Sequence, residues 1–198
     1  MSDWFSYRLN DFLMYSPRTY YRLVELYNAA LWPLHAVAFA LGVAIVGLCV
    51  CPQRAAMRIM MGLLSICWFW VAAAFLHERY ASIHWAGGYM AVLFMIEAML
   101  LLVAAFWRSD RIISRRSGTA GTTGVALVIF AVLILPLAGP LASRPWSQVE
   151  LFGLMPDATA LATIGALVLA CRRELIAALI IPVAWCLYSA ATHWTMGV

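Results

Sequence analysis

Lysine is absent from this sequence, and charge of either sign is scarce. All thirteen basic residues are arginine, and charged residues make up 11% of the 198 positions. Hydrophobic residues make up 65% and the mean hydropathy is +0.88, whereas soluble domains are about 45–50% apolar and about 25% charged. A water-soluble core cannot absorb this excess of apolar side chains, but a lipid bilayer can. The composition therefore predicts one compact membrane domain.

Signatures of several other protein classes are also missing. The sequence has no basic patch interleaved with aromatic residues, which argues against nucleic acid as a partner. It has no GxSxG, no Gly-rich phosphate loop and no HExxH or HxxxH spacing. The five cysteines lie in or beside apolar runs, and their odd number argues against a disulfide framework. The sequence thus gives no support for an enzyme, although it does not exclude one.

Six apolar runs are predicted to cross a bilayer as helices, within a single domain of residues 16–198. They cover residues 17–50, 55–75, 85–107, 120–141, 158–171 and 174–195. Ser16 provides an N-cap for the first helix and Pro17 its first helical position. That helix is about 34 residues or roughly 50 Å long, with a kink at Pro33. The predicted fold class is an all-α polytopic transmembrane helix bundle.

The fifth run is the weakest of the six. Asp157 is interpreted as its N-cap, which leaves about 21 Å of helix before Arg172 and Arg173. A segment this short either thins the bilayer locally or fails to cross. Five spans are therefore the alternative to six.

Two segments are assigned roles other than crossing. Residues 1–15 are predicted to form an amphipathic helix in the membrane interface, because one helical face collects their apolar side chains, namely Trp4, Phe5, Leu9, Phe12 and Leu13. Residues 115–124 (RRSGTAGTTG) are small and polar, and they predict a flexible loop between two three-helix halves.

The arginines predict how the bundle is inserted. The loops after the first, third and fifth spans carry eight of them, and the other side carries five. The eight are Arg54, Arg58, Arg108, Arg111, Arg115, Arg116, Arg172 and Arg173, and the five are Arg8, Arg18, Arg22, Arg79 and Arg144. Because cytoplasmic loops carry the excess of basic residues, we expect a multi-pass protein of the bacterial inner membrane with both termini in the periplasm.

Glu97 lies about twelve residues into the run 85–107, close to the middle of a predicted span. An acid at that depth is costly in hydrocarbon, so it is expected to face the bundle interior, a partner or water, and it marks a candidate functional site. The alternative is a protonated carboxyl that donates to a neighbouring carbonyl.

A polar stripe is predicted on the first span. Glu25, Asn28, Trp32 and His35 follow the spacing i, i+3, i+7, i+10, which keeps them within about 80° of one helical face. Together with Glu97, this face is predicted to line a polar path for a solute or ion from the outer surface to the middle of the membrane. In the alternative, Glu25 and Asn28 simply lie above the hydrocarbon.

All four histidines, His35, His77, His84 and His193, fall at one end of a six-span bundle. Imidazoles at one depth can bind a transition metal, and pairs on facing helices can ligate haem b. The alternative is that interfacial histidines only reach the polar headgroups. Neither haem nor a metal is expected from the spacing alone.

Two other features have weaker implications. Cys49-Val50-Cys51 ends the first span with two thiols, the ligand type that soft metals prefer. The outer loop 139–157 is long for a plain connection, and it is predicted to cover the face with the histidines or to dock a partner.

Two stretches of the sequence are similar to one known family. One is Phe12-Leu13-x-Tyr15-Ser16-Pro17-Arg18-Thr19-Tyr20-Tyr21-Arg22-Leu23, continuing through Asn28 to Leu31-Trp32-Pro33. The other is Pro145-Trp146, Phe152-Gly153-x-x-Pro156-Asp157-x-Thr159 and Ile181-Pro182. They resemble the uncharacterised bacterial membrane family known as domain of unknown function 6064. The resemblance implies a six-helix inner-membrane protein and transfers no activity. We expect an amide near position 97 and asparagine near position 84 in that family, so Glu97 and His84 depart from its pattern.

The sequence leaves two functions open. The first is a protein that binds or passes a small polar solute or ion through a vestibule lined by Glu25, Asn28, Trp32, His35 and Glu97. The second is a membrane subunit or anchor of a larger complex, with a membrane-protein partner or a second copy, that holds haem b or a metal through its outer histidines. A purely structural interaction protein is the third alternative.

Overall fold

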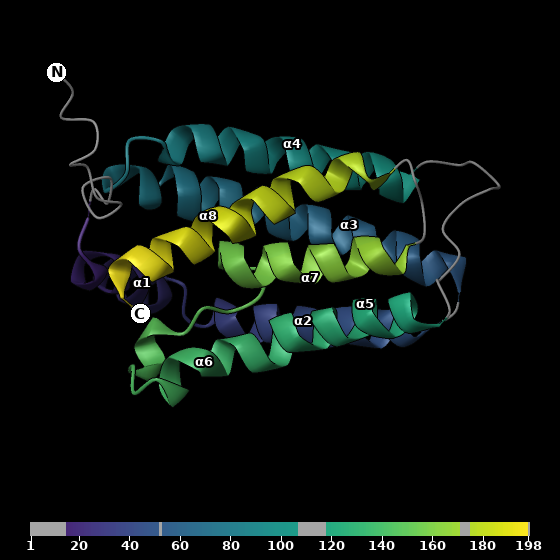
Figure 1. The fold of residues 1–198 in the computed structure, drawn as a ribbon, viewed down its shortest axis with the longest axis horizontal. Coiled ribbons are helices and arrows are strands. Elements are labelled where there is room, and N and C mark those ends of the chain that lie inside the picture. The colour runs from purple at the N-terminus through teal and green to yellow at the C-terminus, as the bar shows by residue number, and fades with distance from the viewer. Residues whose placement is uncertain (1–14, 52, 107–117, 171–174, 198) are drawn as a thin grey trace, which may run out of the picture.

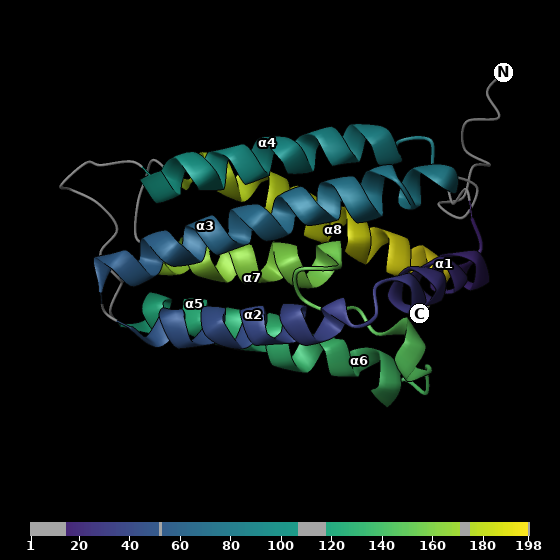
Figure 2. The ribbon, with the colours of Figure 1, turned by 180° about the vertical axis from the view of Figure 1, so that it is seen from behind.

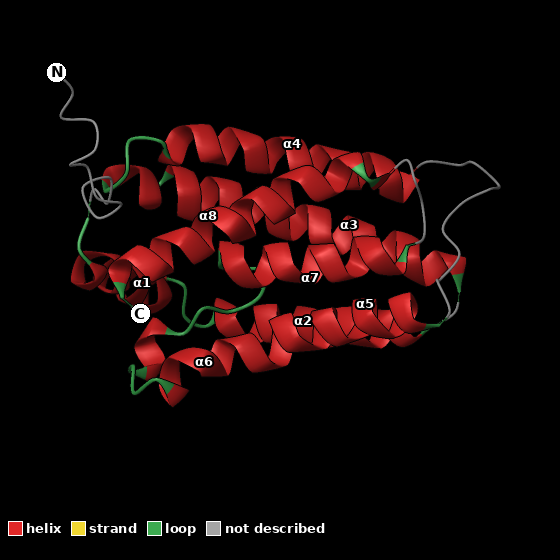
Figure 3. Cartoon of the chain, viewed as in Figure 1, coloured by secondary structure: helices red, strands yellow, loops and turns green. Residues whose placement is uncertain are grey.

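The structure is a computed structural model that describes residues 15–51, 53–106, 118–170 and 175–197. These residues form helices joined by short loops, without a β-strand among them (Figure 3). The elements are α1 (Pro17–Ala30), α2 (Leu34–Val50), α3 (Arg54–Trp70), η3 (Val71–His77), η4 (Tyr80–Ser82), α4 (Gly87–Phe106), α5 (Thr119–Ile129), η5 (Phe130–Ile134), α6 (Leu135–Leu141), η6 (Trp146–Gln148), α7 (Pro156–Leu169), η8 (Ala177–Leu179) and α8 (Ile180–Met196). The all-α prediction is thus confirmed for the described residues. The amphipathic helix predicted at residues 1–15 lies outside them, except for Tyr15.

The first predicted helix is two helices in the structure. Its start is as predicted, because the Ser16 hydroxyl accepts a 3.2 Å hydrogen bond from the Thr19 amide and Pro17 occupies the first turn. After Ala30 the chain turns, and α2 leaves at 95° to α1. Pro33 cannot donate a backbone hydrogen bond and clashes with the preceding turn. The predicted single kinked helix is therefore wrong, and α1 lies across one end of the bundle (Figure 1).

The long helices form three layers, which both views show (Figures 1 and 2). Helix α4 lies on one side of the bundle, and α2 with α5 and α6 lies on the other. Helices α3, α7 and α8 lie between them. Successive long segments run in opposite directions, so the start of α2, the end of η3 and the end of α8 gather at the end where α1 lies.

Helix α5 and helix α7 approach each other closely through glycine. A Cβ atom added to Gly124 would lie 2.8 Å from the Gly165 carbonyl oxygen, and one added to Gly165 would lie 2.7 Å from the Gly124 oxygen. Small residues commonly allow such close helix contacts in membranes. The flexible loop predicted at 115–124 is therefore wrong for its last part, since α5 begins at Thr119. Its residues 115–117 lie outside the described part.

Helix α7 is short and enclosed. It has 14 residues, or about 21 Å of helix, and most of its side chains are buried between the outer layers. Its N-cap is Met155, with Pro156 in the first turn. The prediction of Asp157 as the N-cap is therefore wrong, because that carboxylate turns instead towards α8.

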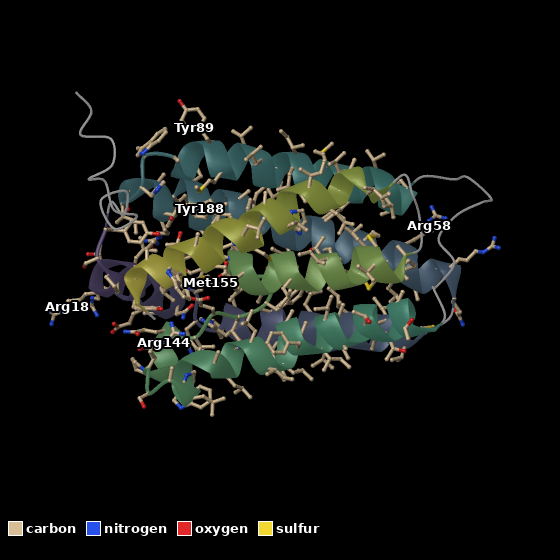
Figure 4. All side chains as sticks on the ribbon, in the orientation of Figure 1. Arg18, Arg58, Tyr89, Arg144, Met155 and Tyr188 are labelled. Carbon is tan, nitrogen blue, oxygen red and sulfur yellow. The ribbon has the colours of Figure 1, made fainter. Side chains whose placement is uncertain are left out.

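The outward faces of the helices are apolar. On α4 the exposed large side chains are Tyr89, Val92, Leu93, Ile96, Met99, Leu100, Val103 and Phe106. By length and composition, four helices in the described ranges can cross a membrane, or five if the bent pair α1–α2 is one span. These helices make a membrane location plausible. Figure 4 shows the side chains projecting outward, with Arg18 and Arg58 at opposite ends of the bundle.

Candidate functional site: a polar cluster at one end of the bundle

The predicted stripe on the first span is not formed. Glu25 lies at the surface in a 2.8 Å ion pair with Arg22. Asn28 is buried, and its amide donates 2.9 Å hydrogen bonds to the carbonyls of Ser147 and Val149. Trp32 is 74% exposed beyond the end of α1, and His35 belongs to α2. Because the helix breaks before Pro33, these residues do not share one helical face.

Glu97 lies inside the bundle with no exposed surface. Neither of its carboxyl oxygens has a hydrogen-bond partner among the residues that the structure describes. Helix α4 packs on α3 and α8, whereas α2 lies on the opposite side of the bundle (Figures 1 and 2). The structure therefore does not bring Glu97 together with Glu25, Asn28 and His35 in one vestibule, and that part of the prediction is wrong.

Asp157 is the centre of a hydrogen-bonded cluster at the end of the bundle where α1 lies. The Asp157 carboxylate accepts a 2.6 Å hydrogen bond from the indole N–H of Trp185 and a 2.7 Å hydrogen bond from the hydroxyl of Ser189. The Ser189 oxygen also lies 3.3 Å from Nδ1 of His193. In a catalytic triad the histidine stands between serine and acid. Here serine stands in the middle and donates to the acid, so the three side chains do not have the order of a catalytic triad.

Tyrosine hydroxyls continue the polar cluster beside Asp157. The Tyr80 hydroxyl shares 2.7 Å hydrogen bonds with the hydroxyls of Tyr15 and Tyr188. The Tyr188 hydroxyl lies 3.5 Å from Nε2 of His84, whose ring stacks on Tyr80. Burial raises the pKa of Tyr15 and lowers the pKa of His84, so both groups favour their neutral forms. The result is a chain of hydroxyl and imidazole groups that can each donate and accept a hydrogen bond.

A second acid reaches the cluster from the loop after η6. The Tyr20 hydroxyl lies 3.4 Å from Oε1 of Glu150 and donates to it. Burial and, next, the nearby charge of Asp157 raise the pKa of Glu150 to about 8, although the Arg144 guanidinium opposes the shift. Arg144 itself lies 4.5 Å above the ring of Tyr21. Burial thus favours the neutral form of the Glu150 carboxyl.

A small cavity opens between these groups. Its volume is about 20 Å³, roughly enough for one water-sized particle. It is lined by Tyr15, Tyr20, Phe75, Tyr80, Asp157, Trp185, Tyr188, Ser189, Thr192, His193 and Met196. In this conformation the cavity suits a water, a hydronium or a bare cation, and it is too small for an organic solute.

An aromatic layer separates this cavity from Glu97. The ring of Trp185, which lines the cavity, lies 4.9 Å from that of Phe94, and Phe94 lies 4.2 Å from Trp68. Because α4 runs away from the cluster, Glu97 lies about 4.5 Å deeper than Phe94 along the helix axis. The order from the bundle end is therefore Asp157, the aromatic rings, and then Glu97.

The structure places the four histidines at one end of the bundle without assembling them. His77 is exposed at the end of η3, His35 belongs to α2, and His84 and His193 adjoin the polar cluster. No group of three or more His, Cys, Asp or Glu side chains within the described ranges is arranged to hold a metal ion. At the other end, the buried Cys49 thiol donates to the Met60 thioether at 3.4 Å, and Cys51 is half-buried.

The sequence contains a signal for this cluster that the predictions did not use. Trp185, Ser189 and His193 are spaced by four residues along the last span, which places them on one helical face. That stripe, together with the acid at position 157 on the preceding long helix, is the sequence feature that locates the site.

The outer loop predicted at 139–157 is partly built into the bundle, whereas its covering of the histidine face stays a prediction. Its η6 turn packs on α1, and its later residues Phe152, Leu154 and Met155 are buried inside the bundle. The Tyr27 hydroxyl donates to the Leu154 carbonyl at 3.2 Å. The loop thus brings Glu150 and Asp157 inward from the end of the bundle, where Figure 4 shows Arg144 and Tyr188.

The fold and the site define a class of protein, an all-helical bundle with apolar helices and a polar, acidic cluster at one end. Residues 18–198 match the family model described as a family of unknown function, DUF6064. The chain belongs to this family, as the resemblance in its sequence indicated. No curated protein and no solved structure matches it.

Proposed function

We propose that the chain is a multi-pass protein of the bacterial inner membrane that binds and passes a small cation, with the proton as its simplest cargo. In this proposal six segments cross the bilayer, including α7, and the polar cluster faces the periplasm with both termini. The arginine distribution in the sequence supports this orientation, because eight of the thirteen follow the first, third and fifth predicted spans.

One observation carries the proposal. The Glu97 carboxyl is fully buried without a hydrogen-bond partner in the described part of the chain, and a buried acid without a partner is costly. It lies just beyond an aromatic layer from a second acidic site that has a water-sized cavity. Two acids in series, separated by a layer of aromatic rings, favour a cation or a proton over an anion.

The Asp157 cluster acts as the entrance of the path. Its carboxylate and the surrounding hydroxyls attract a cation and replace part of its hydration shell. The Trp185 indole holds the Asp157 carboxylate through its N–H and contacts Phe94 through its ring. A shift of this side chain therefore frees Asp157 and opens the aromatic layer at the same time.

The test is flux through purified protein in liposomes. A potassium diffusion potential set by valinomycin drives cations inward, and a trapped dye reports internal pH. We expect proton uptake with the native chain and uptake at the level of empty liposomes with Glu97→Gln. Glu25→Gln is the matched control, because Glu25 is a surface carboxyl at the same end and lies off the path.

Two outcomes overturn the proposal. One is native protein that passes no protons above the level of empty liposomes in this assay and no sodium ions in a matched assay with a trapped sodium-sensitive dye. The other is uptake that survives Glu97→Gln in protein whose helix content and gel-filtration profile match the native chain. Glu97→Asp keeps the carboxyl group and is expected to retain part of the flux, which separates the loss of the acid from a general packing defect. A Soret band or stoichiometric metal in the purified protein would support the alternative of a haem- or metal-holding subunit.

A further inference from the structure

A second, larger cavity lies away from the polar cluster, between α1 and the end of α3. Its volume is about 300 Å³, at the lower end of the range for small-molecule sites. Its lining residues are Tyr27, Leu31, Phe69, Trp70, Ala73, Ala74, Glu78 and Arg79. We call it the elbow groove, because it adjoins the bend between α1 and α2. Figure 2 shows α1 and the end of α3 at the same end of the bundle.

The inner wall of the elbow groove is apolar, and its polar atoms are already paired. The Trp70 indole N–H donates to the Tyr27 hydroxyl at 3.2 Å, and that hydroxyl donates to the Leu154 carbonyl at 3.2 Å. Ala73 and Ala74 belong to the π-helical segment η3 and leave space above them. Phe69 is 56% exposed and extends the wall to the outer surface. Such a wall suits a hydrocarbon chain, because no unpaired donor or acceptor needs water there.

The rim of the elbow groove carries both signs of charge. Glu78 and Arg79 are adjacent, exposed residues at its edge. The one ion pair found among the described residues joins Arg22 to Glu25, so neither rim residue has an ionic partner there. An acid and a guanidinium that line the same groove complement a ligand that carries both a cation and an anion. The guanidinium suits a phosphate and the carboxylate suits an ammonium group.

The groove also lies at the depth where headgroups are expected. Four tryptophans at this end of the bundle are strongly exposed, namely Trp32, Trp85, Trp146 and Trp194. Exposed tryptophan gathers at the boundary between hydrocarbon and water. A ligand in the elbow groove therefore lies with its polar part in the headgroup layer and its apolar part facing the acyl chains.

We propose that the elbow groove binds a phospholipid with a phosphoethanolamine headgroup. The phosphate lies against Arg79, the primary ammonium against Glu78, and the first part of one acyl chain along Phe69 and Trp70. A primary ammonium donates hydrogen bonds to a carboxylate, whereas a trimethylated one has no N–H to donate. The site therefore distinguishes phosphoethanolamine from phosphocholine. This inference does not depend on the passage of cations.

Native mass spectrometry of the purified full chain tests the proposal. The protein in detergent is offered equal amounts of phosphatidylethanolamine, phosphatidylcholine and phosphatidylglycerol with the same acyl chains. We expect the first adduct to be phosphatidylethanolamine, preferred over phosphatidylcholine by about two- to fivefold, as for one exposed ion pair. Glu78→Gln is expected to remove that preference, and Arg79→Gln to weaken the adducts of all three lipids. Glu25→Gln, which alters a carboxyl outside the groove, is expected to change nothing.

A variant that fills the groove distinguishes lipid bound in the elbow groove from lipid bound elsewhere on the surface. Ala73→Trp fills the groove and is expected to abolish the selective adduct while leaving weaker, unselective adducts. The proposal fails if the native protein retains phosphatidylethanolamine and phosphatidylcholine equally. It also fails if Glu78→Gln or Ala73→Trp leaves the preference intact.

Discussion

The indole N–H of Trp185 donates a 2.6 Å hydrogen bond to the Asp157 carboxylate, while the ring of the same residue packs 4.9 Å from Phe94. One side chain thus joins the polar end of the bundle to the aromatic layer above Glu97. Any change that removes this tryptophan acts on both. The two roles of Trp185 can be tested separately by substituting either Asp157 or Phe94 and keeping the tryptophan.

The hydrogen bonds to Asp157 are expected to stabilise the bundle end. Asp157→Ala removes the acceptor of two charge-assisted bonds, one each from Trp185 and Ser189. We expect a loss of about 1–3 kcal/mol in the free energy of unfolding. Chemical unfolding in detergent micelles, followed by circular dichroism, measures it. Ser189→Ala removes only one of the bonds and should cost less. A larger cost for Ser189→Ala would contradict this assignment.

Opening the aromatic layer is expected to raise cation flux. Phe94→Ala removes the ring that lies between Trp185 and Trp68, so the barrier above Glu97 becomes smaller. Liposome uptake should exceed that of the native chain, and Phe94→Leu, which keeps most of the volume, should lie between the two. Combining Phe94→Ala with Glu97→Gln should return uptake to background. Uptake that stays high in the double variant would show a leak that does not use Glu97.

Glu150 is expected to make the protein less stable at alkaline pH. Its pKa is raised to about 8 in the folded protein from an ordinary value of 4.5, so the folded state holds the proton more tightly than the unfolded state. Its contribution to stability is therefore present below about pH 4.5 and is lost as pH rises towards 8. Asp157 adds to the shift and Arg144 opposes it. Thermal unfolding between pH 5 and pH 9 should show a fall in Tm that Glu150→Gln reduces. An equally steep fall in the variant would sink the prediction.

The contact between α5 and α7 is expected to reject even one methyl group. Gly165→Ala places its Cβ atom 2.7 Å from the Gly124 carbonyl oxygen, so the helices must move apart. Overpacking of this kind costs about 1–3 kcal/mol, and a lower Tm reports it. Gly47→Ala is the matched control, because no heavy atom lies within 4 Å of a Cβ atom added there. It should leave Tm unchanged or slightly raised, since alanine favours the helix. Equal effects at both positions would disprove the close contact.

Much of the fold can be predicted from local sequence patterns, because helix starts and apolar runs are local features. Ser16 and Pro17 start α1 as predicted, and the runs 55–75 and 120–141 match helical segments closely. The bend at Pro33 shows the limit. A proline predicts a disturbance of the helix, but the packing around it decides between a kink and a right-angled turn.

The candidate site could be predicted only in part, because it depends on contacts between distant segments. Glu97 is recognisable from its position in an apolar run. Asp157 has the sequence context of a helix cap, and only the packing of α7 against α8 turns it towards Trp185 and Ser189. The glycines at the start of α5 indicate a loop when taken alone, although facing α7 they form a close helix contact.

The shortness of α7 has a consequence for hydrophobic mismatch. A short helix that meets lipid thins the bilayer or tilts its neighbours, but α7 is enclosed by the outer layers and meets the buried loop at Leu154 and Met155 instead. In the membrane location that we propose, only the outer helices have to match the thickness of the bilayer. With 14 residues against 20 in α4, α7 is about 9 Å shorter. Polar groups lie at the start of α7, so the apolar distance across the bundle is about 9 Å shorter there than along α4.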